Sequence, residues 1–116
     1  MGRGGYLVFF QCPPQVAMAR FVIEGGVYIY VGSCGASCLR RVLRHLERPK
    51  ARRWHVDFLQ CRALYGVLTR RGEREVARCL AEMCQAVEGF GSTDNPEAPG
   101  HLFKCGLVEA LRCVKF

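Results

Sequence analysis

Apolar residues in the first third of the chain form short runs separated by turn residues, a pattern typical of β-strands. The aromatic and β-branched run at 6–10 ends at the two prolines at 13 and 14. A second run covers 20–23. A third covers 27–31 and follows the glycine pair at 25 and 26, which favours a hairpin. We therefore expect the three runs to form one antiparallel meander within a single sheet.

Two later segments repeat apolar residues with the helical period of three to four positions. In the first, 38–48, Ser37 is a candidate N-cap and Pro49 ends the helix. The apolar stripe that should face the sheet consists of Leu39, Val42, Leu43 and Leu46. The polar residues that should lie on the far side are Arg41, Arg44, His45 and Arg48.

The second helical segment, 72–88, places two neighbouring carboxylates differently. Its apolar stripe consists of Val76, Leu80, Met83, Cys84 and Val87. At about 100° per residue, Glu73 lies at the edge of this stripe and Glu75 points away from it. We therefore expect Glu73 to lean toward the body of the protein and Glu75 to face water.

The remaining segments complete a fold of class α+β, a small antiparallel β-sheet flanked by α-helices. Residues 63–69 predict a strand, whereas 54–60 fit a short helix or a strand equally well. A turn-rich loop at 89–100 precedes two candidate closing strands at 101–103 and 111–116.

Composition favours a globular domain that binds polyanions. Half of the residues are hydrophobic and 23% are charged, which excludes a disordered or fibrous chain. With 116 residues, one domain over 1–116 is expected. The net charge of +7 would attract nucleic acid or anionic lipid. Seven of the cations lie close together in the sequence: Arg40, Arg41, Arg44, Arg48, Lys50, Arg52 and Arg53.

The expected location is the cytoplasm, with no membrane partner. No apolar run reaches the roughly 20 residues of a membrane span, and the first residues lack the pattern of a signal peptide. The eight cysteines show no CxxC pairs of the kind that bind zinc. Buried free thiols are the first interpretation, disulfides the second and zinc the third. Intracellular disulfides would indicate a hyperthermophilic source.

A distributed set of residues resembles the motifs of the GIY-YIG nuclease superfamily. The set consists of Gly4-x-Tyr6, Tyr30-Val31-Gly32, Arg41 with His45, and Glu73. The resemblance is greatest to one branch, family 123 of the domains of unknown function. Three stretches carry it in order along the chain: 28–33 with 41–46, then 54–59, then 89–94 leading to 101–103. Members of that branch often carry cysteines after the Phe-Gly-Ser-x-Asp stretch, and here Asn95, Pro96 and Glu97 follow Asp94.

The resemblance implies a metal-dependent endonuclease that hydrolyses phosphodiester bonds of DNA, in repair or on particular DNA structures, with RNA left open. Glu73 would hold Mg²⁺ or Mn²⁺, as its helical angle also favours. Arg41 would contact the scissile phosphate, Tyr6 or Tyr30 would accept a proton, and His45 would donate or orient. Glu73 and Arg41 would converge on one cleft with Tyr30. The residues expected to bind nucleic acid are Arg44, Arg48, Lys50, Arg52 and Arg53. Further candidates for the site are Gly32, Ser33, His55, Asp57, Asp94 and His101.

Each of these residues also has a structural interpretation. Tyr30 could be a packing residue, Arg41 part of a solvated helix face, and Glu73 a complement to the helix dipole. His55 with Asp57 could be a structural pair, and Asp94 and His101 could cap loops. The alternative function is a non-catalytic nucleic-acid-binding module of the same fold. A structural or protein-binding domain is disfavoured by the charge of +7.

Overall fold

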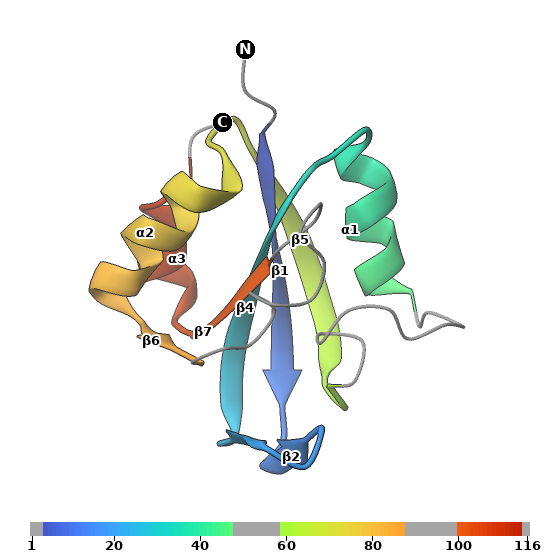
Figure 1. Cartoon of the computed structure of the whole chain (residues 1–116), viewed down its shortest axis with the longest axis vertical. Coiled ribbons are helices and arrows are strands. Elements are labelled where there is room, and N and C mark those ends of the chain that lie inside the picture. Colours follow the sequence, from blue (N-terminus) through green and yellow to red (C-terminus); the bar gives the residue numbers. More distant parts are fainter. Residues whose placement is uncertain (1–3, 48–58, 88–99, 115–116) are drawn as a thin grey trace.

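The computed structural model describes residues 4–47, 59–87 and 100–114, and within them it contains seven strands and three helices (Figure 1). The strands are β1 (Gly5–Cys12), β2 (Gln15–Ala17), β3 (Phe21–Ile23), β4 (Gly26–Ser33), β5 (Arg62–Thr69), β6 (Gln85–Ala86) and β7 (Gly100–Lys104). The helices are α1 (Cys38–Leu46), α2 (Glu73–Met83) and α3 (Leu107–Leu111). Five strands form an antiparallel sheet in the order β5-β1-β4-β7-β6.

The centre of the sheet is the pair β1 and β4, because both strands are apolar along most of their length. In β1 every residue except Gln11 is buried, as expected for a strand that is covered on both faces. The two strands pair over their full length, from Gly5 opposite Ser33 to Cys12 opposite Gly26. β5 pairs with the other edge of β1, and β7 pairs with the other edge of β4.

Helices cover both faces of the sheet (Figure 1). On the α1 face, Tyr6 and Val8 of β1 belong to the same buried cluster as Val42 of α1. On the opposite face, Leu7 of β1 packs with Val76 of α2, and α3 contributes Ala110 to the same cluster. The α+β prediction is therefore confirmed. Among the described residues, no helix has the length and apolar character needed to cross a membrane.

The expected three-stranded meander is wrong in one respect, because the strand at Phe21 does not join the main sheet. β3 pairs only with β2, and the two form a separate ribbon that extends from the end of the β1–β4 hairpin (Figure 1). The reason is that both edges of β1 and both edges of β4 are already paired. The strands that carry Tyr6 and Tyr30 do share one sheet, as predicted.

Helix α1 packs with a different face from the one that its leucine stripe predicts. Of that stripe only Val42 is buried, at 6% exposure, whereas Leu39 is 60% exposed. His45, which we expected on the far side, is buried instead. Two contacts explain this orientation. Val42 fills the space above Gly66, where a Cβ would overlap it, and His45 bonds to Tyr6.

The ends of the later elements also differ from the prediction. The second helix ends at Met83 rather than near residue 88, because the chain becomes extended at Cys84 and pairs with β7 as β6. The closing strand expected at 111–116 is absent from the described residues 111–114, and α3 ends at Leu111. The strands predicted at 63–69 and 101–103 are confirmed as β5 and β7.

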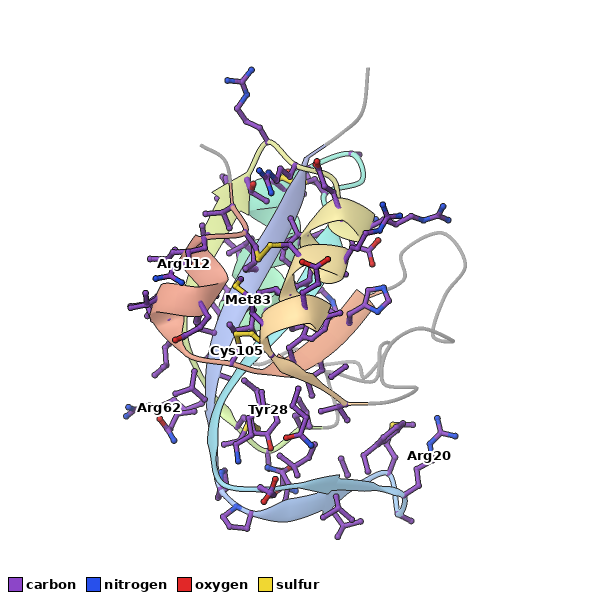
Figure 2. The ribbon with its side chains drawn as sticks, turned by 90° about the vertical axis from the view of Figure 1, so that its left-hand side faces the viewer. Arg20, Tyr28, Arg62, Met83, Cys105 and Arg112 are labelled. Atoms are coloured by element: carbon purple, nitrogen blue, oxygen red, sulfur yellow. A yellow bond between two sulfur atoms is a disulfide. The ribbon has the colours of Figure 1, made fainter. Side chains whose placement is uncertain are left out.

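All eight cysteines are paired in disulfides, so the first interpretation, buried free thiols, is wrong. The pairs are Cys12–Cys61, Cys34–Cys38, Cys79–Cys113 and Cys84–Cys105. Three of them join elements that lie 21 to 49 residues apart in the sequence. Figure 2 shows Cys105 beside the end of α2, to which it is joined through Cys84 just after the helix.

Candidate functional site

Two tyrosines and a histidine form a buried cluster on the α1 face of the sheet. The hydroxyl oxygen of Tyr6 lies 2.8 Å from Nε2 of His45, a hydrogen-bond distance. The His45 ring lies 5.4 Å from the Tyr6 ring and 5.2 Å from the Tyr30 ring, measured between centroids. Both tyrosines are only 1% exposed. The structure therefore brings together three of the four predicted catalytic residues.

The strand register explains why these side chains meet. Tyr6 lies opposite Gly32 and Val8 lies opposite Tyr30, so both phenol rings project from the same face of the sheet. A Cβ at Gly32 would overlap the phenol ring of Tyr6. Glycine at this position thus lets Tyr6 lie across β4 and reach His45.

The mutation Gly32→Ala is expected to destabilise the protein by about 3 kcal/mol, because the added methyl displaces a buried ring and breaks the Tyr6–His45 hydrogen bond. The measurement is the midpoint of urea unfolding. Gly25→Ala is the matched control, because a Cβ there would lie 3.3 Å from the Pro14 side chain and touch nothing closer. Equal midpoints for the two variants would contradict the packing described for Tyr6.

Arg41 lies at the junction between β4 and α1, at the end of the sheet where Tyr6 lies opposite Gly32. Its Nη1 donates a hydrogen bond of 2.8 Å to the backbone oxygen of Ser33. The guanidinium also lies against Gly35, whose φ of 57° is in the left-handed region and where a Cβ would overlap the arginine. The Ser37 side chain caps α1, as predicted, by accepting from the backbone N–H of Arg40 at 3.2 Å. The turn between β4 and α1 therefore fixes the position of the Arg41 side chain relative to the sheet.

Glu73, the first residue of α2, is buried beside His101 of β7. Its Oε1 lies 2.9 Å from Nε2 of His101, and the glutamate is 6% exposed. Glu75 is exposed, so the helical period predicted the orientation of both carboxylates correctly. Helix α2 begins close to β1 because Gly5 has no side chain. A Cβ there would lie 3.2 Å from the Glu73 nitrogen.

The Glu73 carboxylate is incompletely satisfied. Despite the short distance to His101, no hydrogen bond reaches Glu73 Oε1 within the part of the chain that the structure describes. Buried carboxylate oxygens normally have a partner, since burial without one costs free energy. Two atoms of the types that bind divalent cations therefore lie side by side here: a carboxylate oxygen without a hydrogen bond and an imidazole nitrogen. The described ranges contain no group of three or more Cys, His, Asp and Glu that could hold a metal.

The buried cluster and the Glu73–His101 pair lie at the same end of the sheet but on opposite faces. His101 pairs with Val31, which packs on the α2 face, whereas Tyr30 packs on the α1 face. The expected convergence of Glu73 with Tyr30 in one cleft is therefore wrong for this structure. The pairing of Glu73 with His101 was not predicted, because the two residues are far apart in the sequence and meet only through the position of β7 in the sheet.

The other predicted site residues divide into two sets. Gly32 and Ser33 contact Tyr6 and Arg41 as described, and Arg44 is half-buried on α1. The remaining residues lie outside the described part of the chain: Arg48, Lys50, Arg52, Arg53, His55, Asp57 and Asp94. Their roles stay predictions.

A pocket of about 310 Å³, which the sequence did not indicate, lies between the β2–β3 ribbon and β6. Figure 2 shows Tyr28 above the ribbon and Arg20 at its far end. The Tyr28 hydroxyl donates to the backbone oxygen of Glu24 at 2.9 Å, and Lys104 Nζ lies 3.6 Å from the Glu24 carboxylate. Burial raises the pKa of Tyr28, and the Glu24 charge adds to the effect. No residue of the predicted site lines this pocket.

A family model described as "Domain of unknown function DUF123" matches residues 6–115. No curated protein and no solved structure matches the chain.

Proposed function

The chain belongs to the DUF123 family, and from this premise we propose that it is a metal-dependent endonuclease of the GIY-YIG type that hydrolyses phosphodiester bonds of DNA. The proposal extends to a role in DNA repair or on particular DNA structures, with RNA as the alternative substrate. It also includes the cytoplasmic location. The proposal is supported by the motif residues: Tyr6 and Tyr30 share the α1 face of the sheet, Arg41 bonds to Ser33 at the end of β4, and Glu73 is buried beside His101 on the opposite face.

The observation that carries the proposal is the buried Glu73 carboxylate with its unsatisfied oxygen. A buried carboxylate is destabilising unless it is paired, and the partner that the described residues place beside Glu73 is the His101 imidazole, so a bound cation would stabilise the carboxylate further. Hydrolysis of a phosphodiester needs stabilisation of the charge that develops on the phosphate and an activated water. A Mg²⁺ or Mn²⁺ ion held by Glu73 would supply both.

Arg41 has the chemistry to contact the phosphate. A guanidinium presents N–H donors in a planar arrangement that matches two phosphate oxygens. The hydrogen bond to Ser33 and the contact with Gly35 hold the group at the end of the sheet, where it needs little reorganisation. Arg44, one turn from Arg40 on the same helix, would add to phosphate binding.

The Tyr6–His45 pair can move a proton between two defined atoms. The phenol oxygen and His45 Nε2 lie 2.8 Å apart, so in the tautomer whose Nε2 carries no hydrogen the imidazole would accept the Tyr6 proton and could return it. Such a pair would let Tyr6 serve as a general base for water. Tyr6 is 1% exposed and His45 is 7% exposed, so the pair is shielded from bulk water.

A second candidate function is a nucleic-acid-binding module without catalysis, and one observation favours it. Tyr6 and Tyr30 are almost fully buried, and they lie on the face of the sheet opposite Glu73. In that case the tyrosine cluster would be structural, and the basic residues alone would account for binding to phosphates.

Incubation of the intact chain with a panel of labelled DNA and RNA structures separates the two candidates. We expect cleavage of at least one DNA substrate with Mg²⁺ or Mn²⁺ and none with EDTA, because the metal supplies charge stabilisation that the side chains lack. The panel should include nicked, flapped, branched and plain duplexes. Salt-sensitive binding without cleavage on every substrate and with both metals would support the non-catalytic module instead.

A further inference from the structure

We propose that His101 is a direct metal ligand beside Glu73, and that the site therefore binds a first-row transition cation, Mn²⁺ above all, in preference to Mg²⁺. The inference rests on the metal site of the proposed function. It adds a second protein ligand and a choice of metal, and both can be measured without nucleic acid.

The separation of the two donor atoms fits shared coordination. Two ligands on neighbouring corners of an octahedron, each about 2.1 Å from the metal, lie about 3 Å apart. Glu73 Oε1 and His101 Nε2 are 2.9 Å apart. A hydrogen bond would also have this length, but within the described residues no hydrogen bond reaches Glu73 Oε1. The distance between the two atoms is therefore the one that shared coordination of a cation would require.

The solvent exposure of the two side chains indicates from which side a cation would approach. The Glu73 side chain is 5% exposed, whereas that of His101 is 37% exposed, so the approach from solvent is along the histidine. His101 lies on β7 with its ring 6.3 Å from the Phe103 ring, measured between centroids. Because the described residues supply no third side-chain ligand nearby, water or a phosphate oxygen would complete the coordination.

The electrostatics of α2 explain why a carboxylate alone would be a weak anchor. Glu73 is the first residue of the helix, where the positive end of the helix dipole opposes a bound cation. Arg74 follows directly in the sequence and adds positive charge. A second side chain bound directly to the metal, that of His101, would add binding free energy that offsets this repulsion. Imidazole nitrogen suits transition metals, whereas Mg²⁺ strongly prefers oxygen and gives up its water reluctantly.

Mn²⁺ binding to the intact, disulfide-bonded chain tests the inference. Electron paramagnetic resonance counts free and bound Mn²⁺, and electron spin echo modulation detects a ligating nitrogen. We expect a nitrogen coupling in the parent protein and Mn²⁺ affinity at least tenfold above that for Mg²⁺, the latter measured by competition. In His101→Ala the coupling and the preference for Mn²⁺ should both be lost. His101→Gln, which keeps an oxygen ligand, should retain weak binding with no coupling.

Glu75→Gln is the control, because Glu75 is exposed on the same helix, and it should bind Mn²⁺ like the parent. Circular dichroism confirms that each variant is folded. The inference is overturned if the parent binds no Mn²⁺, if the coupling is absent, or if it persists in His101→Ala. None of these results removes the endonuclease proposal, because the cleavage panel tests it separately and includes Mg²⁺ as well as Mn²⁺. Conversely, a parent that binds Mn²⁺ through His101 but cuts nothing supports the inference and contradicts the endonuclease.

Discussion

Glu73→Gln is expected to lower metal-dependent cleavage by at least about a hundredfold, which corresponds to about 2.7 kcal/mol of transition-state stabilisation. The substitution keeps the size of the side chain and removes the charge that would hold the metal. Because the carboxylate is buried and incompletely hydrogen-bonded, its neutral replacement should leave the protein folded. The measurement is the rate of cleavage of the best substrate from the panel, under single-turnover conditions, with saturating metal.

The matched control is Glu75→Gln, two residues further along α2. It removes the same charge from the same helix at an exposed position, so its cleavage rate should stay within about twofold of the parent, since its carboxylate faces water. A loss of activity in Glu75→Gln with normal activity in Glu73→Gln would reverse the assignment. Equal rates in both variants would show that neither carboxylate holds the catalytic metal.

Removing the Cys12–Cys61 disulfide with a double Cys→Ala substitution is expected to lower the free energy of unfolding by about 4 kcal/mol. The two residues lie 49 positions apart, so the bond restricts a long loop in the unfolded chain. In the folded chain the bond joins the end of β1 to the residue before β5, and these strands pair along most of their length. Guanidinium unfolding of the oxidised proteins measures the difference.

Cys34–Cys38 gives an internal comparison for this prediction. Its loop has a sequence separation of only 4, so the same double Cys→Ala change should cost about 2 kcal/mol. Alanine avoids an unpaired buried thiol in both cases. A larger loss at Cys34–Cys38 than at Cys12–Cys61 would contradict the chain-entropy explanation and indicate that the short bond holds the β4–α1 turn in place.

Patterns that depend on neighbouring residues were predicted well from the sequence. The runs at 6–10 and 27–31 form paired strands because continuous apolar residues are stable only where both faces of a strand are covered. The start of α2 and the orientation of Glu73 followed from the helical period, since residues three and four apart lie on one face.

Contacts between distant segments could not be predicted in the same way. The period of α1 identifies an apolar stripe, but it carries no information about the surface that the helix meets. There, Gly66 leaves a space that Val42 fills, and Tyr6 offers a hydrogen bond to His45, so the leucines remain outside. Likewise β3 is apolar enough for the main sheet, and it is excluded because the neighbouring strands have no free edge.

The sequence by itself thus determined the α+β class, the two tyrosine strands in one sheet and the inward orientation of Glu73, because each depends on local spacing. Only the tertiary structure decided the disulfide pairs, the inward face of α1 and the contact between Glu73 and His101. The physical reason is the same for all three. Each depends on which atoms come within bonding distance once strands and helices far apart in the chain have packed. The strand order and the positions of the glycines set those distances.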